Sequence, residues 1–98
     1  MGYLYYGATE RFEFDDRVLT HLRTVILAKL NLQESTVFTW SLAGKQHSLW
    51  LHPAVQLRFE FGSEETPELN PAWIEQMLAL ASSAGGLRLT EEPPPPEP

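Results

Sequence analysis

Apolar and polar side chains alternate along several short segments of the chain, and this alternation is typical of β-strands with one buried face. The predicted strands are residues 3–6, 11–14, 36–42, 47–52, 57–61 and 87–90. The first two would form a hairpin around Gly7-Ala8-Thr9, and Ala43-Gly44-Lys45-Gln46 would join the next pair as a loop. The strands 36–42, 47–52 and 57–61 are expected to lie side by side and antiparallel.

Two further segments repeat apolar residues at the spacing of an amphipathic helix. The first follows Asp15-Asp16, either of which can cap a helix, and should end near Asn31. The second opens at Asn70-Pro71, where Asn caps and Pro takes the first helical position. Gly85-Gly86 supplies its C-terminal stop.

The predicted order of elements is β-β-α-β-β-β-α-β, which is typical of the α+β class. Both helices have an apolar stripe that must be buried, and each strand has one apolar face. We therefore expect a two-layer sandwich, with a mainly antiparallel sheet and both helices on one of its faces. The opposite face of the sheet would have no cover from this chain.

The composition indicates how many domains the chain forms and in which cellular compartment we expect it. The chain has 98 residues, 43% of them hydrophobic and 20% charged, which suits one globular domain. It contains no cysteine, so disulfides and cysteine nucleophiles are excluded. No apolar run reaches the length of a membrane span, and the first residues do not resemble a signal peptide. We expect a cytoplasmic protein that does not bind membranes.

The net charge of −6 comes from the C-terminal third of the chain. Acids and bases balance over residues 1–62, whereas Arg88 is the single base among residues 63–98. Tight nucleic-acid binding depends on clustered Lys and Arg, so we expect weak binding at most. Residues 1–90 would form the domain, and the acidic, proline-rich residues 91–98 a disordered tail. The alternative for the tail is a polyproline II ligand for a partner's groove.

No arrangement of residues typical of catalysis or metal binding is visible. His47 and His52 should point to opposite faces of one strand, and His21 has no second ligand-type residue one helical turn away. No serine lies in a nucleophile motif, and no glycine-rich loop is placed to hold phosphate. We therefore expect no cofactor, no metal and no enzyme activity.

The uncovered sheet face is the remaining candidate site. Its side chains should be small or polar except for Trp50, whose exposed indole is typical of a contact surface. Thr39, His52 and Arg58 are expected around it. The prediction is a non-catalytic binding module that contacts a second copy of itself or another protein. One alternative is that Trp50 is covered by its own neighbours. Another is a nucleic-acid accessory protein that stacks bases on Trp50 with Arg58 at a phosphate.

Four segments together resemble a family of bacterial proteins of about this length and of unknown function. They are residues 1–7, 14–22, 50–54 and 69–75, which include Trp50-Leu51-His52-Pro53-Ala54 and Leu69-Asn70-Pro71-Ala72-Trp73. Members often carry the label ATP-dependent DNA ligase. Such ligases attach AMP to the lysine of a K-x-D-G motif, which neither Lys29-Leu30-Asn31-Leu32 nor Lys45-Gln46-His47-Ser48 matches. The resemblance therefore implies a family without implying ligase activity.

Overall fold

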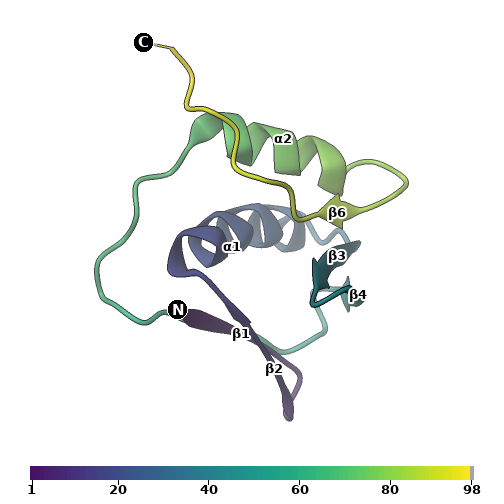
Figure 1. Ribbon diagram of the computed structural model, residues 1–98. Coiled ribbons are helices and arrows are strands. Elements are labelled where there is room, and N and C mark those ends of the chain that lie inside the picture. Colours follow the sequence, from purple (N-terminus) through teal and green to yellow (C-terminus); the bar gives the residue numbers. More distant parts are fainter. Residues whose placement is uncertain (98) are drawn as a thin grey trace.

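The computed structural model describes residues 1–97 and confirms the α+β class and the predicted order of elements (Figure 1). The strands are β1 (Gly2–Tyr6), β2 (Glu10–Phe14), β3 (Thr36–Leu42), β4 (Lys45–Leu51), β5 (Leu57–Glu60) and β6 (Leu87–Arg88). The helices are α1 (Asp16–Asn31) and α2 (Pro71–Ala81), capped by Asp15 and Asn70.

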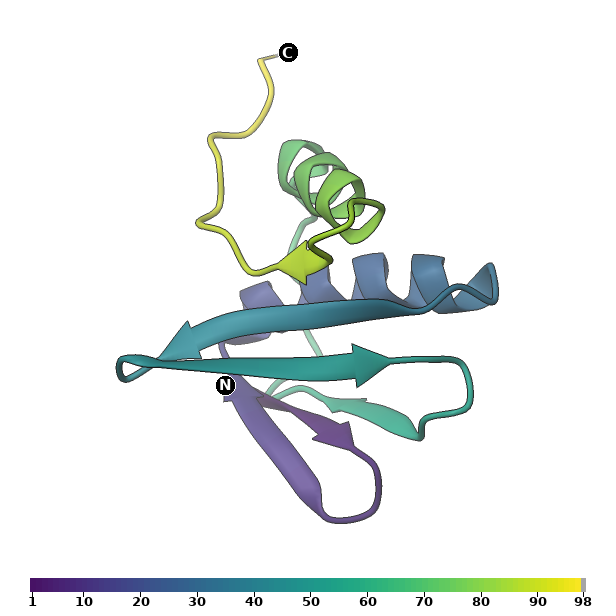
Figure 2. The same cartoon turned by 90° about the vertical axis from the view of Figure 1, so that its right-hand side faces the viewer.

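The strands form two three-stranded sheets and not the single sheet expected from the sequence. Sheet 1 has the order β2-β1-β5 and sheet 2 the order β4-β3-β6. All neighbours are antiparallel except β3 and β6, which are parallel. Figure 2 shows the long β3–β4 hairpin of sheet 2 beside the shorter strands of sheet 1.

The prediction that β5 lies beside β4 is wrong, because β5 pairs with β1. Pro53 ends β4 as expected, and the chain then bends, with the Val55 N–H donating to the His52 carbonyl at 2.9 Å. The Gly7 N–H donates to the Gln56 carbonyl, also at 2.9 Å, and this bond draws the chain toward the end of β1. The bend after Pro53 thus carries β5 from one sheet to the other.

The connection between β3 and β4 is shorter than the predicted loop. Ala43 and Gly44 have φ values of 53° and 77°, which is typical of a two-residue type I′ turn. Lys45 and Gln46 therefore belong to β4, where they face Leu42 and Ser41. The pairing register of the hairpin is uninterrupted from Thr36 and Leu51 to Leu42 and Lys45.

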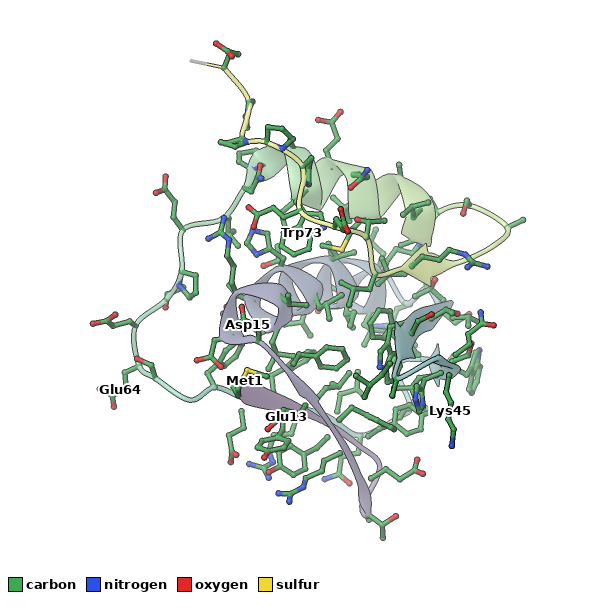
Figure 3. The ribbon with its side chains drawn as sticks, viewed as in Figure 1. Met1, Glu13, Asp15, Lys45, Glu64 and Trp73 are labelled. Carbon is green, nitrogen blue, oxygen red and sulfur yellow. The ribbon has the colours of Figure 1, made fainter. Side chains whose placement is uncertain are left out.

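Helix α1 lies at the centre of the molecule, with sheet 1 on one side, sheet 2 on another and α2 on a third (Figure 1). The inner faces of both sheets and one face of α2 pack around it, and Figure 3 shows Trp73 in the layer between the helices. Because α1 is enclosed on several sides, polar residues beside its apolar stripe are buried too. His21 is 0% exposed and Lys29 is 7% exposed, although the sequence pattern placed them off the stripe.

Residues 91–97 follow β6 and pass along the N-terminal end of α2 (Figure 1). Arg17 donates to both carboxylate oxygens of Glu92, at 2.7 and 2.6 Å. The Asn70 amide nitrogen donates to Glu92 at 3.0 Å and to the Pro93 carbonyl at 2.8 Å. The disordered tail at residues 91–98 stays a prediction, and Pro98 lies outside the described residues.

Candidate binding surface

Trp50 lies on the outer face of the β3–β4 hairpin in sheet 2, opposite to the face that carries Phe38 and Leu49, as the alternation along β4 predicts. Its side chain is 54% exposed, whereas Trp40 and Trp73 are 6% and 2% exposed and belong to the core. Leu32 and Leu42 are exposed even more, so exposure alone does not single out Trp50; what does is its aromatic ring, because tryptophan is enriched in protein interfaces.

His52 stacks on Trp50, with the ring centroids 4.8 Å apart and the planes inclined by 22°. The His52 Nδ1 atom accepts a hydrogen bond from the Ala54 N–H at 3.0 Å, which orients the imidazole ring. The bend after β4 thus fixes one side of the indole. The opposite face of the Trp50 indole ring is the part that a partner can contact.

A hollow of about 330 Å³ lies beside Trp50. Val37, the partner of Trp50 across the β3–β4 hairpin, is 40% exposed and forms part of its wall. Small residues make up most of the rest of the lining, and the full set is Ser35, Thr36, Val37, Trp50, Ala81, Ser83, Ala84, Gly85 and Gly86. We call Trp50, His52, Val37 and this hollow the Trp50 surface.

Thr39 and Arg58, the other two predicted site residues, do not join the Trp50 surface. Thr39 lies on the same outer face but is 7% exposed, and its hydroxyl is 2.9 Å from that of Ser48. Arg58 is on β5 in sheet 1, where its guanidinium group lies 3.9 Å from the centre of the Tyr5 ring. The structure therefore brings together Trp50 and His52, leaves Thr39 to support the hairpin, and places Arg58 on the other sheet.

Tyr6 connects the two sheets next to Trp50, a role that the sequence did not indicate. Hydrogen-bonded and non-hydrogen-bonded pairs alternate along an antiparallel hairpin, and Leu42 and Lys45 at the type I′ turn form a hydrogen-bonded pair. By this alternation Val37 and Trp50 form a non-hydrogen-bonded pair, so the Trp50 carbonyl points away from β3. The Tyr6 hydroxyl donates to that carbonyl at 2.7 Å. This bond holds the end of β4 in place.

The outer face of the β3–β4 hairpin carries no charged side chain. Its members are Val37, Thr39 and Ser41 on β3 and Gln46, Ser48 and Trp50 on β4. The nearest charged side chain on this face of sheet 2 is the exposed Arg88 of β6, beside Thr39. A partner that covers only the hairpin therefore buries no unpaired charge, which would be costly. The surface is therefore suited to an apolar or uncharged contact.

Within residues 1–97, no group of three His, Cys, Asp or Glu side chains is arranged to hold a metal ion. None of the helices in that range combines the length and the apolar character needed to cross a membrane.

Residues 1–92 match a family model described as a domain of unknown function, DUF7882. The chain belongs to this family. The match confirms the expected resemblance to a family without an assigned function, and it covers the whole Trp50 surface. No curated protein and no solved structure matches the chain.

Proposed function

We propose that this chain is a small, non-catalytic protein-binding module of the cytoplasm, and that it binds another protein through the Trp50 surface. One observation carries the proposal: an indole that is 54% exposed, stacked on His52, borders a hollow lined by small side chains. Tryptophan is enriched among the residues that contribute most to binding energy in protein interfaces.

The partner we propose inserts an apolar side chain into the hollow, against Trp50 and Val37. A volume of about 330 Å³ is at the low end for sites that enclose small-molecule ligands, and it suits a side chain better. The uncharged outer face of β3 and β4 supports an uncharged contact around it. Electrostatic attraction would then contribute little to this interface.

The nucleic-acid alternative, with Trp50 and Arg58 acting together, has less support. Arg58 lies in the other sheet, beside Tyr5 and 3.5 Å from the carboxylate of Glu60. Phosphate contacts also need a surplus of basic side chains, whereas the chain carries a net charge of −6.

The ligase label is also outside our proposal. Lys29 is 7% exposed and its ammonium group lies 2.7 Å from Glu34, so it is not placed to receive AMP. Lys45 follows the turn of the hairpin without the motif that nucleotide transfer requires.

The test compares Trp50→Ala with Leu42→Ala, which removes another exposed apolar side chain from the same hairpin. Leu42 is 63% exposed and lies at the turn end of β3, away from the hollow. Proteins captured from an extract of the native host by the wild-type chain are identified, purified and titrated against both variants. We expect Trp50→Ala to weaken binding by about 30-fold or more and Leu42→Ala to leave it within about threefold.

Circular dichroism of both variants establishes that the fold is retained. Equal binding by a folded Trp50→Ala variant would refute the proposed site.

A further inference from the structure

The outer face of sheet 1 carries its charges in two parallel rows that run across the strands. The register of β2, β1 and β5 places directly opposed residues on the same face. The first row is Glu13, Tyr3 and Glu60, and the second is Arg11, Tyr5 and Arg58. One row is thus acidic at both ends, the other is basic at both ends, and a tyrosine lies at the centre of each.

These side chains lie at the surface and are held in place mainly by the tyrosines. The Arg11 guanidinium group lies 4.6 Å from the centre of the Tyr3 ring, and that of Arg58 lies 3.9 Å from the Tyr5 ring. The two tyrosine rings are 6.1 Å apart. The pair between Arg58 and Glu60, at 3.5 Å, is exposed on both sides and therefore weak.

We propose that this face binds a second copy of the chain and forms a symmetric dimer. A two-fold axis that lies between the rows and parallel to them places the acidic row of one copy over the basic row of the other. Glu13 then meets the partner's Arg11, Tyr3 meets the partner's Tyr5, and Glu60 meets the partner's Arg58. Because the axis is two-fold, every contact occurs twice, and the dimer leaves no free copy of this face to bind a third chain.

The charge pattern selects a second copy over other occupants. The two rows carry equal and opposite charge, so the face matches itself after rotation, whereas for a nucleic acid or an anionic membrane the repulsion by Glu13 and Glu60 offsets the attraction by Arg11 and Arg58. Tyrosine and arginine are both enriched in protein interfaces. Two sheets packed face to face in this way also resemble the layers of a β-sandwich.

Six side chains per copy make a small interface, so the dimer should be weak and sensitive to salt. Stable complexes bury about 800 Å² on each partner and involve about 20–30 residues a side, many more than the six of the two rows. Charged side chains at an exposed interface are screened by added salt. We expect dissociation in the micromolar range or weaker, and tighter binding at low ionic strength.

This dimer is independent of the Trp50 surface, which lies on the other sheet. The two proposals therefore fail separately: Trp50→Ala should leave the dimer unchanged, and substitutions in the two rows should leave binding to the Trp50 surface unchanged.

The experiment measures self-association by analytical ultracentrifugation for two double variants and their mixture. Arg11→Glu with Arg58→Glu makes both rows acidic, and Glu13→Arg with Glu60→Arg makes both rows basic. We expect each double variant to be monomeric alone, because like charges would face each other. An equal mixture of the two should form a heterodimer at least as tight as the wild-type dimer, because every opposed pair is then complementary.

Two controls keep the test decisive if a double variant is unstable. Arg11→Gln with Arg58→Gln removes the basic charges without adding repulsion and should weaken the dimer by about tenfold or more. The wild-type chain itself should associate less as salt is added. A wild-type chain that is monomeric at low salt, or double variants that dimerise alone as the wild type does, would overturn the proposal.

Discussion

His21 illustrates how one buried side chain can join segments that are far apart in the sequence. Its Nδ1 atom lies 2.7 Å from the Arg17 carbonyl, so this nitrogen carries the hydrogen. Its Nε2 atom accepts the Asn70 N–H at 2.8 Å, and its ring lies 4.6 Å from that of Trp73. The neutral ring thus ties α1 to the start of α2.

Replacing His21 by leucine should destabilise the fold. The Asn70 N–H would lose its acceptor while remaining buried, and an unsatisfied buried donor costs about 1–3 kcal/mol. Equilibrium unfolding in urea measures the change in the free energy of unfolding. A change smaller than about 0.5 kcal/mol would contradict this account of His21.

Glu92 should contribute to stability in a pH-dependent manner. Hydrogen bonds from Arg17 and Asn70 lower the pKa of Glu92 from 4.5 to about 2. Because the pKa is lower in the folded chain, the contribution is fully present above about pH 4.5 and is lost as the pH falls toward 2. Glu92→Gln should therefore unfold at a lower temperature than the wild type at neutral pH, and the two should converge near pH 2.

Thermal unfolding of both proteins over this pH range provides the measurement. Equal midpoints at neutral pH would show that the carboxylate of Glu92 does not hold residues 91–97 to the body.

At the scale of elements, the close approach of β6 to β3 depends on one glycine. Gly86 has a φ of 79°, and a Cβ atom there would lie 2.6 Å from the carbonyl oxygen of Val37. Two residue pairs join β6 to β3, so a small shift would disturb the whole contact.

Gly86→Ala should lower the free energy of unfolding by more than about 1–2 kcal/mol, since the left-handed conformation alone costs that much and the clash adds to it. Gly85→Ala is the matched control, because a Cβ at Gly85 meets no atom within 4 Å. Chemical denaturation of both variants checks the difference. Equal stabilities for the two would contradict the described packing of β6.

The periodicity of the sequence predicts the elements well but not all of their neighbours. Asp15 and Asn70 cap the helices as expected, and Phe38 and Leu49 face the core. The partner of β5 was mispredicted because alternation shows which face of a strand is buried and not which strand lies beside it. The bend after Pro53 and the bond between Gly7 and Gln56 decide that choice in three dimensions.

At the scale of the whole molecule, the central position of α1 leaves two outer sheet faces of different character. In sheet 2 the outer face of the β3–β4 hairpin is uncharged and carries Trp50, with Arg88 of β6 beside Thr39 at its edge, and sheet 1 offers rows of opposite charge. The sequence predicted the exposed indole and its neighbour His52. It could not predict the hollow, because residues 81–86 reach Trp50 only through the packing of α2 and β6. Arg58 was assigned to the wrong surface because its strand joins the other sheet.

Fluorescence quenching by acrylamide tests the central claim, that the Trp50 surface is where the chain binds a partner. Trp40 and Trp73 are buried, so quenching in the free protein should come almost entirely from Trp50. We expect a purified partner captured by the chain to protect this fluorescence from acrylamide at saturation, and the Leu42→Ala variant to show the same protection. If the partner binds fully while Trp50 remains as accessible to acrylamide as in the free chain, the claim is contradicted.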